Sequence, residues 1–103
     1  MNDVTRRAVT ATVEWLARHR VAEGDQVVSL QLLKISEEAG EAAGAWIGAL
    51  GQNPRKGVTH VRSEVAAELA DVVLTALVAI ESLGFDPDEV VSECAAKVLA
   101  RVS

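Results

Sequence analysis

Two pairs of carboxylic acids, each spaced three residues apart, are the side chains of this 103-residue chain best suited to chemistry. Glu38 and Glu41 form the first pair, and Glu68 and Asp71 form the second. A spacing of three places both acids of a pair on one face of a helix. Two such helices side by side would direct four carboxylates at one point, where their repulsion favours a bound cation. Because Mg²⁺ and Mn²⁺ prefer oxygen ligands, we expect all four acids to hold one of these metals.

Each acid pair taken alone is typical of a solvated helix face. The two pairs together favour a metal site, because each interrupts sequence that is otherwise apolar. Glu68 and Asp71 are the only charged residues in 65–80, and Glu41 is the only one in 39–50. An unpaired charge among buried apolar residues is costly, so a cation is the economical partner. The alternative is a structural helical protein whose acids lie on its surface and do not respond to metal.

Helical periodicity predicts an all-α chain, with helices near residues 4–21, 29–50, 60–83 and 87–102. Residues 22–25 separate the first two helices, with Gly24 suited to a helix C-terminus. Glycine, asparagine and proline mark residues 51–57 as a loop. We expect Thr59 to cap the third helix. Asp86 is expected to cap the fourth, with Pro87 in its first turn and Glu89 completing a capping box.

The apolar residues predict which helix faces are buried. In the first helix we expect Val9, Val13 and Leu16 to point inward, with Trp15 a further candidate. One side of the second helix carries an apolar set: Leu32, Ile35, Ala39, Ala42, Ala43 and Trp46. The third helix is apolar nearly all round, and four helices of one chain can hardly enclose it. We therefore expect a second subunit to cover it.

Composition narrows the class of protein. The length suits a single domain spanning residues 1–103. A net charge of −5 argues against nucleic acid or an anionic membrane as the main partner. The only cysteine, Cys94, allows no internal disulfide and no cysteine-based zinc site, which fits a reducing cytoplasm. We expect no signal peptide and no membrane span, because the uncharged stretch at 72–80 is too short to cross a bilayer.

The two acidic motifs resemble those of a known family. Glu37-Glu38-Ala39-Gly40-Glu41, followed by Glu68-Leu69-Ala70-Asp71, is similar to the EExxE and ExxD signature of the MazG-like all-α nucleoside triphosphate pyrophosphohydrolases. The loop Asn53-Pro54-Arg55-Lys56-Gly57 also resembles a small MazG-like subgroup. The resemblance covers most of the chain, from the second helix through the fourth.

The resemblance implies a four-helix MazG-like bundle that assembles as a dimer or tetramer. It implies cleavage of a nucleoside triphosphate between the α- and β-phosphates, giving a monophosphate and pyrophosphate, in the clearance of unwanted nucleotides. It also implies Mg²⁺ or Mn²⁺ on Glu38, Glu41, Glu68 and Asp71. Glu37 and Glu38 would be catalytic, Glu37 by holding a second metal or orienting the attacking water. The alternative is a catalytically weak or inactive module that binds metal or nucleotide, or acts in regulation.

Four further residues are candidates for substrate binding. Lys34 lies one turn from Glu38 and either forms an ordinary intrahelical ion pair or contacts a phosphate. Lys56 is either a solvated loop residue or part of an anion site. Trp46 is a core residue by default, with base stacking as the functional alternative. Lys97 is a candidate phosphate contact in the last helix.

Overall fold

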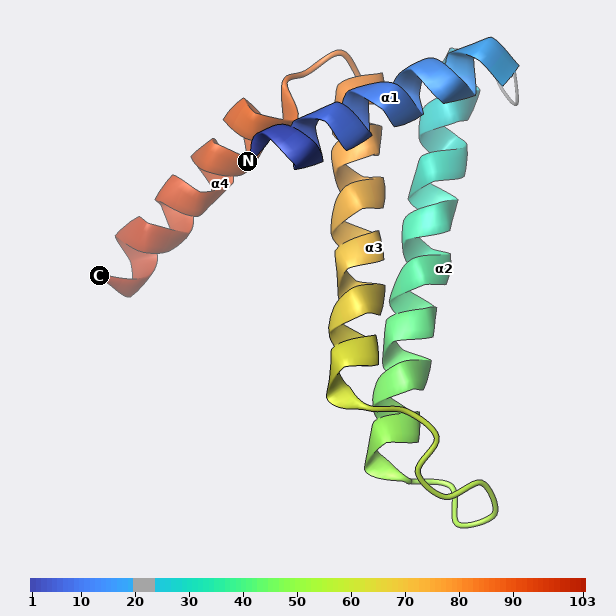
Figure 1. Ribbon diagram of the computed structural model, residues 1–103. Coiled ribbons are helices and arrows are strands. Elements are labelled where there is room, and N and C mark those ends of the chain that lie inside the picture. Colours follow the sequence, from blue (N-terminus) through green and yellow to red (C-terminus); the bar gives the residue numbers. More distant parts are fainter. Residues whose placement is uncertain (20–23) are drawn as a thin grey trace. The chain divides into compact units, whose positions relative to one another are not determined.

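The computed structural model describes residues 1–19 and 24–103, and within these residues it contains four α-helices and no strand (Figure 1). The helices are α1 (Asp3–His19), α2 (Asp25–Leu50), α3 (Arg62–Ser82) and α4 (Pro87–Val102). The prediction of an all-α chain is therefore confirmed. None of the described helices combines the length and hydropathy needed to cross a membrane.

The first helix boundary that differs from its prediction is the start of α2. The helix begins at Asp25 rather than near Ser29. Gly24 precedes it with a positive φ of 55°, and its carbonyl accepts the N–H of Val27 at 3.1 Å. Asp25 then supplies a negative charge to the first turn, where the helix dipole favours one. The expected end of the first helix near Val21, and the break at 22–23, lie outside the described residues.

The start of α3 is set by a different side chain from the one expected. Glu64 accepts the backbone N–H of Val61 at 3.0 Å, and its own N–H donates to the Val61 carbonyl at 3.0 Å. This reciprocal pair satisfies two groups that a helix end leaves without partners. The hydroxyl of Thr59 instead bonds Nδ1 of His60 at 2.9 Å. The prediction that Thr59 caps this helix is therefore wrong.

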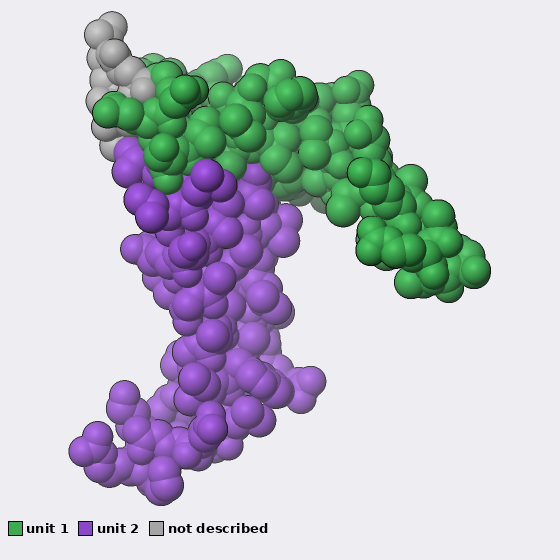
Figure 2. Space-filling view, turned by 180° about the vertical axis from the view of Figure 1, so that it is seen from behind, with its two compact units in different colours: residues 1–29, 77–103 green, residues 30–76 purple. Residues whose placement is uncertain are grey.

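Contact clustering divides the chain into two compact units, and each is described separately (Figure 2). Unit 1 comprises residues 1–29 and 77–103. Within it, Asp86 caps α4 by accepting the N–H of Asp88 at 2.9 Å, and Pro87 occupies the first turn, as predicted. The amino group of Met1 donates to Asp88 at 2.9 Å, and Arg6 lies within 3.6 Å of both acids. These contacts fasten α1 to the start of α4.

Unit 2 comprises residues 30–76 and contains most of α2 and the first part of α3, which run side by side and antiparallel (Figure 1). Its buried residues on α2 follow one stripe: Gln31, Glu38, Ala42 and Ala45. The alanines on this stripe are small, which permits close packing. The expected inward face holds only for Ala42 and the half-buried Ile35. It is wrong for the other four residues, which are exposed: Leu32, Ala39, Ala43 and Trp46.

The apolar residues left uncovered in unit 2 are the second feature of its packing. On α3, Leu69 and Val73 keep more than half of their surface exposed, so within the chain this helix is not buried all round. On α2, Leu33 is also more than half exposed, and Ile47 is 48% exposed. Helical hairpins derive most of their stability from packing an apolar face. These side chains therefore form a surface that the hairpin itself does not cover.

Candidate metal centre

Three of the four predicted metal ligands converge in unit 2. Glu38 and Glu41 project from α2 and Glu68 from α3, and each offers a carboxylate oxygen within 4.8 Å of the other two. The three carboxylates, called the acidic cluster below, come from both predicted motifs. Because α2 and α3 run antiparallel, residues that are distant in the sequence face each other here. The cluster is graded in burial: Glu38 is buried, Glu68 half-buried and Glu41 exposed.

Asp71, the fourth predicted ligand, is not brought into the acidic cluster. It lies one turn beyond Glu68 on α3 and is exposed, while its backbone carbonyl accepts the hydroxyl of Thr75 at 2.8 Å. Glu41 faces Glu68, with carboxylate oxygens of the two side chains within 4.8 Å of each other. Glu38 lies three residues before Glu41 on α2, and Asp71 lies three residues after Glu68 on α3. In an antiparallel pair of helices, these equal steps lead to the same level, so Asp71 lies opposite Glu38. Aspartate has one methylene fewer than glutamate, so it reaches less far across the same gap.

Repulsion within the cluster is concentrated on Glu41. The charge of Glu38 is the largest cause that raises the pKa of the Glu41 carboxyl, followed by desolvation and the charge of Glu68. Like charges at this separation disfavour the ionised form. The fold therefore places the Glu41 carboxylate among like charges, and a bound cation would stabilise its ionised form.

Lys34 forms an ion pair with only one member of the cluster. Its Nζ lies 3.1 Å from Glu38 and 3.9 Å from Glu37, so the intrahelical ion pair is present. The hydrogen bond to Glu38 is the main cause that raises the pKa of Lys34. The Glu38 side chain is only 11% exposed, so its charge needs this partner. Among the described residues, neither Glu41 nor Glu68 forms an ion pair within 4.0 Å, and the cluster keeps an excess of negative charge.

The other predicted site residues lie around the cluster or apart from it. Glu37 is exposed on α2 and contacts only the edge of the Lys34 ammonium. Trp46 is 40% exposed, and the guanidinium of Arg62 lies 5.4 Å from its ring centroid, which is a cation–π contact. Base stacking by Trp46 stays a prediction. Lys97 lies exposed on α4, in unit 1, and its phosphate contact also stays a prediction.

Lys56 lines a pocket of about 180 Å³ that the sequence did not reveal. Its walls come from the end of α2, at Gly44 and Gly48, and from the loop that follows, including Asn53 and His60. Two signals in the sequence were available: glycines at a four-residue spacing on α2, and a basic loop bounded by glycines. Neither signal shows by itself that the loop folds back onto the helix.

Comparisons with known proteins do not identify a family for this chain. No protein-family model, curated protein or solved structure matches the chain. The case for a function therefore rests on the two motifs and on the geometry of the acidic cluster.

The charge distribution leads to a prediction about metal-free stability. Glu41→Gln is expected to raise the melting temperature at pH 7 in EDTA, because it removes a repelled charge and keeps the side-chain shape. Lys34→Gln is expected to lower stability by about 0.5 kcal/mol, a value that allows for solvent screening of this half-exposed lysine.

The pH dependence of the Glu41 effect has a defined sign. A folded-state pKa raised above the ordinary 4.5 means that folding favours the protonated acid. This contribution to stability is fully present below pH 4.5 and is lost as the pH rises through the raised pKa. The advantage of Glu41→Gln over the wild type should therefore shrink as the pH falls through the raised pKa and be lost by about pH 4.5. Thermal unfolding across this range measures it, and a variant less stable than the wild type at pH 7 would contradict it.

Proposed function

We propose that the chain is a MazG-like, metal-dependent nucleoside triphosphate pyrophosphohydrolase. It would cleave its substrate between the α- and β-phosphates and release a nucleoside monophosphate and pyrophosphate. The observation that carries this proposal is the convergence of Glu38, Glu41 and Glu68 from the two motifs that resemble the family signature. The exposed free Cys94 and the family resemblance support a cytoplasmic role in nucleotide clearance.

The donor set fits Mg²⁺ or Mn²⁺. All three converging groups are carboxylates, which hard divalent cations prefer, and the raised pKa of Glu41 reflects a surplus of negative charge. A metal bound here would neutralise phosphate charge and acidify a water molecule. Asp71 lies one turn away on α3, opposite Glu38, and is proposed as the fourth ligand.

The protein groups around the metal have separate tasks in this proposal. Glu38, Glu41 and Glu68 bind the cation from two helices, which fixes its position between them. Lys34 orients the Glu38 carboxylate through the 3.1 Å ion pair. Glu37, next to Glu38 and exposed, is proposed to orient the attacking water or to accept its proton. The reacting phosphate would approach from the solvent side, where Glu41 is exposed.

We also propose that the chain assembles as a dimer or tetramer of MazG-like bundles. The supporting observation is the uncovered apolar surface of unit 2, which includes Leu32, Leu33 and Ile47 on α2 and Leu69 and Val73 on α3. Contiguous exposed apolar surface marks interaction sites in folded proteins. A second copy of the chain would cover these residues and enclose the acidic cluster in drier surroundings.

One observation favours a second candidate, a module that binds metal or nucleotide with little catalysis. Asp71 stands outside the 4.8 Å cluster, so the arrangement of ligands is complete only if the side chain moves toward the metal. A site that binds a cation through three glutamates alone would still bind the metal. Without the fourth ligand, it would not fix the metal's position as closely as catalysis requires.

The test of the proposed function is turnover of a panel of canonical and modified ribo- and deoxyribonucleoside triphosphates. Each reaction is run with Mg²⁺, with Mn²⁺ and with EDTA, and its products are separated by ion-exchange chromatography. Metal-dependent formation of monophosphate and pyrophosphate supports the proposal. Release of diphosphate and inorganic phosphate would refute the assigned bond. Absence of turnover together with metal-induced stabilisation would favour the binding module.

A further inference from the structure

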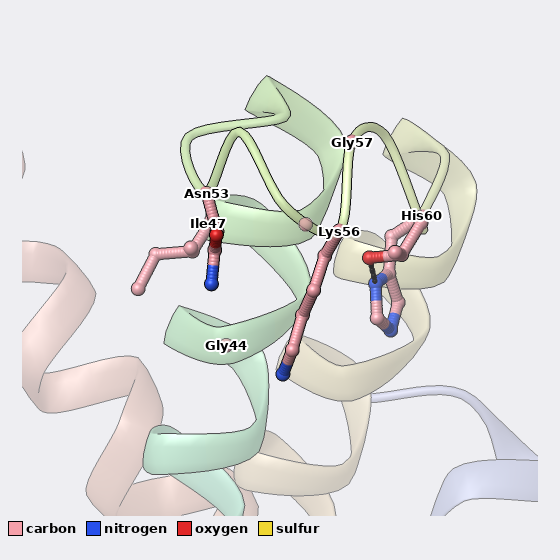
Figure 3. Close-up of a pocket in the computed structure, with 8 residues that line it drawn as sticks. Gly44, Ile47, Asn53, Lys56, Gly57 and His60 are labelled. Carbon is pink, nitrogen blue, oxygen red and sulfur yellow. Dashed lines mark hydrogen bonds between the residues drawn. The ribbon is translucent and has the colours of Figure 1, made fainter.

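The pocket beside the loop between α2 and α3 is a built feature of unit 2 (Figure 3). Residues 51–61 fold back onto the end of α2, and the N–H of Thr59 donates to the Gly48 carbonyl at 3.0 Å. A Cβ on Gly48 would overlap the side chains of Thr59 and His60, so glycine is required for this close approach. The pocket wall is therefore fixed by contact between the loop and the helix.

Two polar side chains of the pocket, Asn53 and Lys56, offer free hydrogen-bond donors. The carboxamide oxygen of Asn53 already accepts the N–H of Arg55 at 3.0 Å, which leaves its NH₂ group for a ligand. The ammonium of Lys56 has three donors and no acceptor. Figure 3 shows that both side chains extend from the loop toward the level of Gly44. A lining of this kind selects a ligand that is rich in acceptors.

The charge of the pocket has the same implication. None of its lining residues is acidic, although the chain as a whole carries a net charge of −5. In the described part of the chain, Lys56 forms no ion pair within 4.0 Å. An unpaired ammonium beside an amide donor is the usual arrangement for an oxyanion, because charge-assisted hydrogen bonds are the strong ones.

The loop holds these two donors in a fixed relation. The backbone carbonyl of Asn53 accepts the N–H of Lys56 at 3.1 Å and that of Gly57 at 3.0 Å. Gly57 has a φ of 68°, a conformation that favours glycine, and it returns the chain toward α3. The separation between the Asn53 amide and the base of the Lys56 side chain is thus set before a ligand arrives, which reduces the cost of ordering.

The pocket also lies close to the acidic cluster along α2. Glu41, Gly44 and Gly48 recur at spacings of three and four and therefore share one face of the helix. Gly44 follows Glu41 by about 4.5 Å along the helix axis. An anion in the pocket would lie about one to two turns from the cluster, which is a distance that a polyphosphate chain can span.

We propose that this pocket is a phosphate-binding site, in which the Lys56 ammonium and the Asn53 amide bind the outer phosphates of a nucleoside triphosphate. Pyrophosphate, as the matching free anion, would bind in the same place. Only the identification of the nucleotide rests on the proposed function. Binding of the free anion follows from the donors, the charge and the glycine-built wall.

The first arm of the test uses inorganic pyrophosphate and the uniformly ¹⁵N-labelled full chain in EDTA, so that no metal takes part. Chemical-shift changes are expected to concentrate at the amides of Gly44, Gly48, Gly57 and Lys56. Lys56→Gln is expected to weaken binding at least about tenfold, through loss of a charge-assisted contact. The matched control is Arg55→Gln, which removes the same charge from the neighbouring loop residue outside the pocket and should change affinity less than about twofold.

The outcomes separate this inference from the proposed function. Equal weakening by both variants, or shifts spread over the whole surface, would overturn the phosphate site in favour of general charge attraction. A second arm measures KM for a triphosphate that the wild type hydrolyses, and a wild-type KM in Lys56→Gln would overturn the assignment to the nucleotide. If the wild type hydrolyses nothing, the proposed function fails, and the pyrophosphate titration still decides whether the pocket binds phosphate.

Discussion

Glu41→Gln is expected to lower metal-dependent triphosphate hydrolysis by at least about 100-fold. Mutation of a group that only hydrogen-bonds to a metal ligand already lowers metal affinity or activity by about 10- to 100-fold, and loss of a ligand itself should have a larger effect. Glutamine keeps the shape of the side chain and removes the charge that a hard cation needs. The raised pKa of Glu41 indicates that the metal-free fold gains from this change, so the loss of activity would not reflect unfolding. Steady-state rates with Mg²⁺ and Mn²⁺, alongside thermal unfolding of the same sample, measure both effects.

The matched control for this substitution is Glu93→Gln, which removes one carboxylate from the exposed surface of α4. It should hydrolyse triphosphates at the wild-type rate. Full turnover in Glu41→Gln would show that the acidic cluster is not the metal site. Asp71→Asn extends the comparison, because a loss as large as that of Glu41→Gln would show that Asp71 joins the cluster when metal binds.

The acidic cluster was predictable from the sequence because its determinants are local. A spacing of three decides that Glu38 and Glu41 share a helix face, and the loop at 51–61 makes an antiparallel hairpin the simplest connection. The position of Asp71 was not predictable in the same way. Spacing places it on the correct face, but whether its carboxylate joins the others depends on side-chain reach and helix separation, which are tertiary properties.

The inward face of α2 shows a second limit of local reasoning. The helix carries two usable stripes, one through Leu32 and Trp46 and another through Ala42 and Ala45. The structure packs the alanine stripe against its neighbour within the hairpin and leaves the larger side chains exposed. Periodicity identifies both stripes, but it does not say which one packs within the hairpin and which one is left exposed.

Helix ends and the loop pocket also differ in how well the sequence predicts them, because some depend on local contacts and others on long-range contacts. The cap at Asp86 was found because its partner lies two residues away and Pro87 fixes the first turn. At the start of α3, Glu64 accepts the N–H of Val61, whereas the hydroxyl of Thr59 bonds the ring of His60. The pocket depends on the same loop folding back onto Gly48, which is a long-range contact that no spacing rule describes.

Saturating Mn²⁺ is expected to raise the melting temperature of the wild-type chain by roughly 10–20 °C. A ligand at 100 times its dissociation constant adds about 2.7 kcal/mol to the stability of the folded state. In a domain of this size each kcal/mol shifts the melting temperature by about 4–8 °C. The reason lies in the cluster itself, where three carboxylates repel one another and a cation converts that repulsion into attraction. EDTA should reverse the shift.

Glu68→Gln should remove most of this stabilisation, whereas Glu93→Gln should retain it, because only the first removes an oxygen ligand that α3 contributes. The stabilisation should also fall as the pH is lowered through the raised pKa of Glu41, since protons then compete with the cation for that carboxylate. If neither Mn²⁺ nor Mg²⁺ changes the melting temperature at any pH, the acidic cluster is a group of surface charges and not a metal site. The phosphate site proposed at Lys56 would not be affected by that result, because its donors act without a metal.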